Sequence, residues 1–562
     1  MAAKPLVLKK QKVGNSSRAK TFLVAAEVYV TDLPFHLDNT FTYGIPEDLI
    51  GNAKTGTRVK VPFKQSEKFG YIRKLVQKEV IARPILEIKK DFGIPENHMM
   101  FLISIAERYG TSLDSILKFV KASALSDSES SSRRFKPRFE FAGELSFESL
   151  ARQIDESQGM SLVIAPTERE LSHLKHQLGT FSLDQKKIIF GLRSAIMQVF
   201  NNLENIFIFD DWSEHYRERK NPYWHIREVA ILRSRIEPIK LRFISALPSM
   251  EIFQYSRKKI IDTPKRGYRR QRTKIAFLPS SYFETVKMGL SRGRVLVSVA
   301  TKDVIQAVIC KKCRCSLKCE CGGNLKLVTA NKLSCSICSR LNLNWRCLVC
   351  AGHEFVELRS GAKKLREQFQ KIFPNVPIFL STAEKPVVTV PKGSIVVATP
   401  GMEPKENYAA VIFLEAEFRV NSPYLRAEEE TRLQIYSLIA SLENQGSFYI
   451  DLEINHPLVQ SLLKEKPILD IERELREREL LHLPPVWNFV RISNGNLRQL
   501  AKSLKQLLSD AKFQLIDDDK ALIVRTKEGD TTTLMKELFL VQKYLSLKQQ
   551  TLLKIEREPA DL

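Results

Sequence analysis

Nine cysteines lie within 41 consecutive residues of this 562-residue chain, and the rest of the chain contains none. Cysteines that only fill a hydrophobic core are scattered along a sequence, and a disulfide framework requires a secreted chain. The sequence has no apolar run of transmembrane length and no apolar core of a signal peptide near its N-terminus. We therefore expect a cytoplasmic protein, in which a dense cysteine cluster indicates metal ligands.

The spacing of the cysteines supports metal binding. Eight of them form four close pairs, in the segments CKKC, CEC, CSIC and CLVC, and the ninth is Cys315. Zinc binds four thiolates in a tetrahedron, and one tight turn presents two sulfurs to the same ion, so four pairs suffice for two structural zinc sites. An iron–sulfur cluster is the alternative. Few apolar residues separate the pairs, so bound metal would supply much of the folding free energy of this segment.

The chain is strongly basic, with 88 lysines and arginines against 64 aspartates and glutamates and a formal net charge of +24. An excess of this size favours a polyanionic partner, most often a nucleic acid, because lysine and arginine neutralise phosphates. The alternatives are a ribosome-associated protein and a protein that is merely basic. Charge thus indicates nucleic-acid contact without specifying the nucleic acid.

Hydrophobic periodicity predicts a multidomain α/β protein. Alternating patterns near the N-terminus predict a β-rich domain followed by a pair of helices. Short continuous apolar runs, such as SLVIAP and IFIFD, predict two α/β units, with the cysteine-rich segment inserted into the second. The last segment follows a strand–helix–strand–strand–helix–strand order. The predicted regions are a basic flexible tail (1–21), the β-rich domain with its helices (22–123), a linker (124–139), the first α/β unit (140–263), a basic segment leading into the second unit (264–305), the cysteine-rich insertion (306–355), the rest of the second unit (356–460) and a C-terminal α+β domain (461–562).

Several segments, taken in order along the chain, resemble one known family. LPFHLDNTFTYGIPEDL and GTRVKVPF lie near the N-terminus, FGLRSAI and DDWSEHY lie in the first α/β unit, and VVATPG and LRAEEETR follow the cysteines. Together they resemble the PriA family of replication restart proteins (primosomal protein N-prime), most of all the reduced actinobacterial type that lacks helicase motifs. The resemblance implies an N-terminal domain that binds the 3′ end of DNA, two degenerate RecA-like helicase lobes, and a zinc module inserted into the second lobe.

The resemblance also implies which cysteines share an ion. One zinc would be held by the first and last pairs, Cys310, Cys313, Cys347 and Cys350. The other would be held by the middle pairs, Cys319, Cys321, Cys335 and Cys338. The CEC pair is one residue shorter than the family's usual pair, so Cys315 stays open as a replacement for Cys319 or Cys321.

In the N-terminal domain, the resemblance implies DNA contacts by Phe41, Tyr43, Arg58 and Lys60. This chain departs from the family at two positions, because it has Thr42 where the family usually has Asp and Lys64 where the family usually has Gly. The alternative for the aromatic residues is that they belong to the hydrophobic core of the domain.

The parts of a nucleotide-driven motor are missing from the sequence. A phosphate-binding loop needs G-x-x-x-x-G-K-[ST], which supplies backbone amides, a lysine charge and a hydroxyl for magnesium, and the chain contains no Gly-Lys-Ser/Thr. Trp212 and Ser213 interrupt the acidic D-E-x-H box, and the segment 437–448 has no arginine where the family has G-R-x-G-R. We therefore expect no nucleotide-binding and no catalytic residues.

These observations lead to three hypotheses about function. The first is a DNA-binding protein of replication restart, or primosome assembly, that recognises forked DNA without unwinding it. For this hypothesis the resemblance implies primosome proteins, single-strand binding protein and the replicative helicase as partners. The second is a divergent ATP-dependent 3′–5′ DNA helicase. The third, a zinc-ribbon protein that binds RNA, explains the charge and the cysteines but not the ordered α/β segments.

Overall fold

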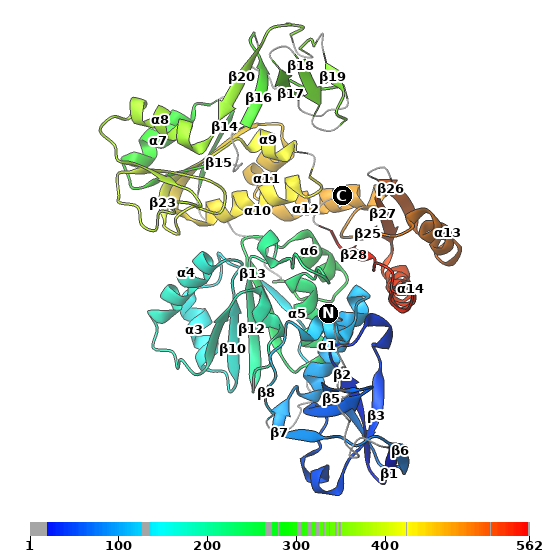
Figure 1. Ribbon diagram of the computed structural model, residues 1–562. Helices are drawn as coiled ribbons and strands as arrows, with labels where there is room; N and C mark the ends of the chain where they lie inside the picture. The colour runs from blue at the N-terminus through cyan, green and yellow to red at the C-terminus, as the bar shows by residue number, and fades with distance from the viewer. Residues whose placement is uncertain are drawn as a thin grey trace, which may run out of the picture. The chain divides into compact units, whose positions relative to one another are not determined.

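The chain is multidomain and α/β, with a β-rich N-terminal part (Figure 1). Unit 1 comprises Met1–Arg138, Ala151–Arg242 and His482–Pro559, and unit 2 comprises Phe139–Leu150, Phe243–Leu481 and Ala560–Leu562. The computed structural model describes residues 19–125, 134–264, 273–278, 280–299, 305–312, 317–320, 325–329, 332–335, 338–342, 345–347, 350–422, 424–516 and 519–559. Most of the predicted basic tail, half of the predicted linker and the basic stretch at 265–272 lie outside these residues. Within the described ranges, no helix combines the length and apolarity needed to cross a membrane.

Unit 1 begins with a six-stranded antiparallel sheet in the order β3-β2-β5-β4-β7-β8. One face of this sheet buries a core that includes Val28, Val59 and Ile72, because successive side chains along a strand point to opposite faces. A separate antiparallel ribbon joins β1 (Lys20–Phe22) to β6 (Val80–Ala82). The six strands are β2 (Ala25–Val30), β3 (Thr40–Gly44), β4 (Thr57–Phe63), β5 (Ser66–Val76), β7 (Glu87–Gly93) and β8 (Ser123–Ala124).

The predicted pair of helices follows the sheet strands, as α1 (Glu96–Tyr109) and α2 (Leu113–Leu117). α1 ends where Gly110 adopts a left-handed conformation with φ of 57°, which glycine reaches without steric cost. Ser112 then begins α2, because its side chain accepts a hydrogen bond from the backbone N–H of Ser115. The helical pair and its break are therefore confirmed.

The first α/β segment forms a five-stranded sheet in the order β11-β10-β12-β13-β9. β10 pairs in parallel with both β11 and β12, and its residues Leu162–Ile164 are fully buried, as the continuous apolar run predicts. The strands are β9 (Arg138–Phe141), β10 (Met160–Ile164), β11 (Ile188–Gly191), β12 (Leu203–Phe209) and β13 (Lys240–Ser245). The helices are α3 (Phe147–Asp155), α4 (Glu168–Gly179), α5 (Ile226–Ile236) and α6 (Met250–Arg257).

Unit 2 contains a six-stranded parallel sheet in the order β14-β24-β23-β15-β22-β21. Every residue of β15 and β23 is buried, so these strands are covered on both faces. The strands are β14 (Lys274–Leu278), β15 (Val295–Val299), β21 (Ile378–Ser381), β22 (Ile395–Ala398), β23 (Tyr408–Leu414) and β24 (Leu442–Glu453). The helices are α7 (Tyr282–Leu290), α8 (Ala362–Ile372), α9 (Ala416–Val420), α10 (Ala427–Ala440), α11 (Pro457–Lys464) and α12 (Pro467–Leu480).

The cysteine-rich segment is inserted into unit 2 between β15 and α8, as the sequence predicts. β16 (Ile305–Cys310) and β20 (Phe355–Ser360) pair antiparallel and form a stalk (Figure 1). Beyond the stalk, a small antiparallel sheet contains β17 (Leu325–Thr329), β18 (Lys332–Cys335) and β19 (Leu341–Asn342). Buried cysteines and a few leucines make up the core of this insertion.

The C-terminal segment has the predicted strand–helix–strand–strand–helix–strand order, and it belongs to unit 1. Its antiparallel sheet has the order β26-β27-β25-β28, and α13 and α14 pack against the apolar side of this sheet. The elements are β25 (Asn488–Ser493), α13 (Leu497–Leu507), β26 (Lys512–Ile516), β27 (Ala521–Thr526), α14 (Glu528–Leu547) and β28 (Lys554–Arg557).

Candidate nucleic-acid interface and metal centres

The face of the N-terminal sheet opposite its core carries cationic and aromatic side chains. In β4 and β5, every second residue points into the core, and the residues between them point outward. The outward residues form what we call the outer-face patch: Arg58, Lys60, Phe69, Tyr71 and Arg73. Cationic groups and exposed aromatic rings are the two components of surfaces that bind single-stranded nucleic acids.

Strand pairing brings the members of the outer-face patch together. Arg58 lies directly opposite Tyr71, and Lys60 lies directly opposite Phe69. The guanidinium carbon of Arg58 is 4.3 Å from the centroid of the Phe69 ring, which is a cation–π contact. Lys60 donates a hydrogen bond to Glu67, and this bond raises the pKa of Lys60 above its usual value. The patch is therefore a connected surface rather than a set of isolated side chains.

The structure separates the four residues for which the sequence predicts DNA contacts. Arg58 and Lys60 lie on the outer face, whereas Phe41 and Tyr43 pack with the core on the opposite face. Tyr43 is 5% exposed, its hydroxyl donates to the carbonyl oxygen of Pro62 at 3.2 Å, and burial raises the pKa of Tyr43 to about 12. The Phe41 ring makes an edge-on contact with Phe63, with centroids 5.2 Å apart.

Phe69, Tyr71 and Arg73 were missed by motif comparison, although the sequence contains a signal for them. In the segment KFGYIRKL they occupy every second position, and Gly70 and Ile72 between them are buried. A strand with one buried face predicts that the alternate residues share the other face. Their approach to Arg58 and Lys60 depends on the β4–β5 register, which sequence alone leaves open.

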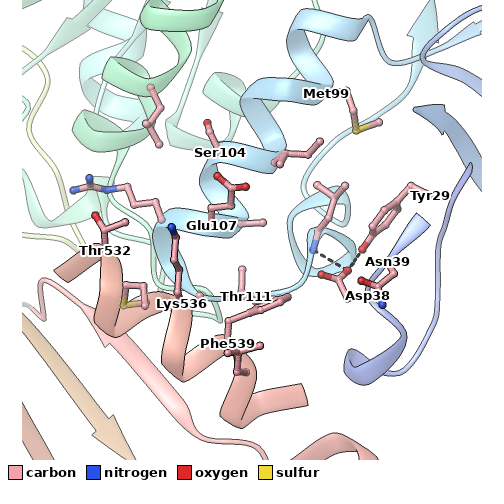
Figure 2. A pocket seen from close by; sticks show the side chains of 18 of the residues that line it. Tyr29, Asp38, Asn39, Met99, Ser104, Glu107, Thr111, Thr532, Lys536 and Phe539 are labelled. Carbon is pink, nitrogen blue, oxygen red and sulfur yellow. Dashed lines mark hydrogen bonds between the residues drawn. The ribbon is translucent and has the colours of Figure 1, made fainter. Parts of the chain in front are cut away.

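A pocket of about 1150 Å³ lies within unit 1, where the N-terminal sheet, α1 and α14 approach one another. Figure 2 shows Met99, Ser104 and Glu107 of α1 on one side and Thr532, Lys536 and Phe539 of α14 on another. Tyr71 and Arg73 also line the pocket, so it adjoins the outer-face patch.

Asp38 is a half-buried ionisable group that lines this pocket. Its carboxylate accepts hydrogen bonds from the hydroxyl of Tyr29 and from the backbone N–H of Leu113, the second at 3.2 Å (Figure 2). Burial nevertheless outweighs these bonds and raises the pKa of Asp38 to about 6. The group therefore titrates within two pH units of neutrality.

Six described cysteines gather into two clusters in the inserted segment. One cluster comprises Cys310, Cys347 and Cys350, and the other comprises Cys319, Cys335 and Cys338. Within each cluster, the sulfur atoms all lie within 4.8 Å of one another. The predicted ligands Cys313 and Cys321, and the ninth cysteine Cys315, lie outside the described residues. These six cysteines fall into the two sets that the family resemblance implies.

Tight turns follow one cysteine of each cluster. The backbone N–H of Ala351 donates to the carbonyl oxygen of Cys347 at 2.8 Å, and Ala351 has a left-handed φ of 55°. The second cluster repeats this arrangement, because Ser339 donates to the carbonyl oxygen of Cys335 at 3.1 Å and also has φ of 55°. Sets of neighbouring thiols on such turns match the sulfur ligands of structural zinc.

The position at which a phosphate-binding loop is expected is a strand–loop–helix connection in the structure. β9 ends at Phe141, α3 begins at Phe147, and the five intervening residues read Ala-Gly-Glu-Leu-Ser. The hydroxyl of Ser146 accepts a hydrogen bond from the backbone N–H of Ser149 at 3.1 Å, so this hydroxyl caps the helix. The connection contains no lysine to balance phosphate charge.

The acidic box is engaged in structural contacts. Asp211 is fully buried, and its carboxylate accepts a hydrogen bond from the guanidinium of Arg227 at 2.9 Å. The Tyr216 hydroxyl donates to the carbonyl oxygen of Phe209 at 2.7 Å, which closes the turn after β12. Glu214 lies 3.6 Å from Arg217 in an ion pair.

Comparison with known proteins shows which proteins this chain resembles. Residues 28–121 match the family described as the 3′DNA-binding domain (3′BD) of PriA. The probable replication restart protein PriA of Mycobacterium leprae is 26% identical over 358 residues, which are 58% of this chain and 54% of that protein. The replication restart protein PriA of Chlamydia pneumoniae is 24% identical over 355 residues, which are 54% of this chain and 46% of that protein.

The chain spans about half the length of the curated relatives it matches. Among solved structures, Saccharomyces cerevisiae Dbp5 bound to RNA and ADP BeF3 is similar with a TM-score of 0.33 and 8% identity, covering 68% of this chain and 97% of that chain. A likeness this weak supports no argument. The matched N-terminal domain and the curated relatives confirm the family that the order of motifs predicts: this chain is a relative of the replication restart protein PriA.

Proposed function

We propose that the protein binds DNA in replication restart and recognises forked DNA through its N-terminal domain. The observation that carries this proposal is the match of residues 28–121 to a 3′DNA-binding domain. The outer-face patch lies within these residues, and the net charge of +24 suits a polyanionic ligand. An RNA-binding zinc ribbon remains a poorer explanation, since it leaves the two α/β sheets without a role.

The two α/β sheets are, in this proposal, degenerate RecA-like helicase lobes that have lost the motor. Two observations support the proposal. The strand–loop–helix connection between β9 and α3 lacks the phosphate-binding residues, and Asp211 is held in a buried ion pair with Arg227. Phosphoryl transfer depends almost entirely on positioning and on charge neutralisation at the phosphates. The divergent helicase therefore lacks the groups that its chemistry requires.

The inserted segment is proposed to hold two structural zinc ions. Cys310, Cys313, Cys347 and Cys350 would bind one, and Cys319, Cys321, Cys335 and Cys338 would bind the other. Zinc in such sites supplies folding free energy and has no open position for chemistry. Primosome proteins, single-strand binding protein and the replicative helicase are the proposed protein partners, and the zinc insertion is proposed as a surface for docking them.

The deciding experiment measures binding of the full-length protein to forked, duplex and single-stranded DNA at about 50 and about 200 mM salt. We expect the forked DNA to bind more tightly than plain duplex. We also expect affinity to fall by orders of magnitude between the two salt concentrations, as neutralisation of roughly six or more phosphates requires. Equal affinity for all three shapes, or binding that is insensitive to salt, contradicts the proposal.

A further inference from the structure

We propose that the outer-face patch binds the single-stranded arm of branched DNA, with bases stacked on Phe69 and phosphates neutralised by Arg58 and Arg73. This inference rests on the proposed function, because it names the form of DNA that the N-terminal domain holds and the residues that hold it. Phe69, Tyr71 and Arg73 are absent from the motifs that identified the domain, and the register of the sheet assigns them to the same surface.

The order of groups on the patch suits a nucleic-acid strand. Phe69, Tyr71 and Arg73 follow one another along the same face of β5, at a spacing of roughly 6.7 Å for alternate residues of a strand. Arg58 and Lys60 form a second, parallel row on β4, directly opposite Tyr71 and Phe69. A strand lying along this face therefore meets rings and cations side by side, which is the arrangement of single-strand binding grooves.

The exposed aromatic ring favours unpaired bases over a duplex. Phe69 is 38% exposed, although contact with water does not stabilise an apolar phenylalanine ring. The guanidinium of Arg58 covers part of this ring at 4.3 Å and can itself stack with a base plane. Bases in a duplex are already stacked on one another and present only their edges and phosphates, so an exposed ring adds nothing to duplex binding.

The same surface is a poor fit for an apolar protein partner. Phe69 is the one large apolar side chain of the patch, and protein interfaces require a larger apolar centre. Glu67 and Glu87 lie close to Lys60, and Glu67 forms an ion pair with it. These carboxylates weaken phosphate binding at Lys60, so we assign the larger share of phosphate neutralisation to Arg58 and Arg73.

The test uses the full-length protein and fluorescence anisotropy with a labelled single-stranded thymidine oligonucleotide and a blunt duplex of the same length. Phe69→Ala is expected to weaken single-strand binding about five-fold or more, which corresponds to the ~1 kcal/mol or more of one base–aromatic stack. Phe69→Leu keeps the apolar volume and is expected to lose affinity to a similar extent. The duplex affinity is expected to stay within two-fold of the unmodified protein. Tyr424→Ala is the matched control, because Tyr424 is a 61% exposed aromatic residue of unit 2.

Two charge variants test the phosphate contacts. Arg58→Gln is expected to weaken binding and to reduce the slope of log affinity against log salt by about 0.7, the value for one contact on a single strand. Glu67→Gln is expected to strengthen binding, because it removes a carboxylate and frees Lys60 for phosphate. Arg476→Gln is the matched control, since the Arg476 side chain is 73% exposed on α12. Thermal melts of every variant separate lost contacts from lost folding.

The outcomes separate this inference from the proposed function. If the unmodified protein binds none of the DNA forms, the proposed function fails. If the unmodified protein binds DNA but Phe69→Ala, Phe69→Leu and Arg58→Gln bind single strands as tightly as the controls, the patch is not the single-strand site and the inference is overturned. If these variants lose duplex and single-strand affinity equally, the patch contacts only the backbone, and the stacking inference is overturned as well.

Discussion

Asp38 illustrates, at the scale of one residue, how burial sets the charge state of the protein. Its carboxylate accepts two hydrogen bonds that favour the ionised form, yet burial dominates and raises the pKa of Asp38 to about 6. The usual value is 3.8, so the folded protein binds this proton more tightly than the unfolded chain does. The stabilisation from this proton is complete in acid and is lost as the pH rises from about 4 through about 6.

We predict that Asp38→Asn removes this pH dependence. The asparagine stays neutral, so the melting temperature of the variant relative to the unmodified protein should rise between pH 4.5 and pH 7.5. Thermal melts followed by circular dichroism at several pH values give the difference in melting temperature between the two proteins. Other titrating groups affect both proteins equally, so their contributions cancel in this difference. A difference that is constant with pH would show that Asp38 keeps its ordinary pKa in the folded protein.

The cysteines are a second case at the residue scale, because the fold determines which of their sulfur atoms lie close together. Cys310 and Cys350 have sulfur atoms 3.5 Å apart although 40 positions separate them in the sequence, and Cys319 and Cys338 have sulfur atoms 3.8 Å apart. Sulfur atoms this close are positioned to share one metal ion, which binds cysteine as thiolate. A metal bound at each cluster would therefore contribute to the stability of this segment.

We predict two zinc ions per chain by metal analysis of the purified protein. Cys350→Ser is expected to remove one ion and to leave the other, because the clusters draw on different cysteines. Cys315→Ser is expected to retain both ions. One zinc or none in a folded, unmodified protein would contradict the assignment, and loss of an ion in Cys315→Ser would show that Cys315 replaces Cys319 or Cys321.

At the scale of elements, α10 and α12 are joined by buried ion pairs. Arg432 is 1% exposed, and its guanidinium donates to Asp470 at 3.3 Å and also to Glu474. Arg432 lies in the LRAEEETR segment, which resembles a late helicase segment of the family. In this chain its charge is used to hold two helices together.

We predict that Arg432→Ala lowers the free energy of unfolding by about 3 kcal/mol, because Asp470 and Glu474 each lose one of the two arginines that they contact. Arg476→Ala on α12 is the control, since its pair with Glu472 is exposed and should contribute at most about 1 kcal/mol. Denaturant unfolding measures both values. A change below about 1 kcal/mol for Arg432→Ala would mean that the carboxylates become protonated or hydrated at little cost.

At the scale of the whole molecule, two large α/β sheets are present in a chain whose sequence contains no Gly-Lys-Ser/Thr. β15 and β23 are buried throughout, as in a parallel sheet covered on both faces. The loop between β9 and α3 and the acidic box after β12 serve helix capping and a buried ion pair. In the proposed function, these sheets position binding surfaces without nucleotide turnover.

We predict no ATP hydrolysis and no unwinding, with or without forked DNA. Without the loop lysine and the magnesium-binding hydroxyl, the triphosphate has no cradle, and an arginine from elsewhere would restore only charge in the transition state. Steady-state phosphate release and a strand-displacement assay measure the two activities. DNA-stimulated hydrolysis that survives further purification and falls in Asp210→Ala would support the divergent helicase instead.

The sequence by itself determined the local elements and their order. The α1–α2 break at Gly110, the buried strand β10, the insertion after β15 and the C-terminal strand–helix pattern all follow from residue spacing, because periodicity and capping act over a few residues. The resemblance of ordered motifs supplied the family and the two sets of cysteines.

Only the tertiary structure decided which distant residues meet. It placed Tyr43 in the core and Arg58 on the outer face, and it made Phe69 a neighbour of Arg58 through the register of β4 and β5. It also built the pocket from α1 and α14, which are more than 400 residues apart in the chain. Strand register and helix packing depend on the burial of side chains from the whole chain, and short-range patterns contain no information about such contacts.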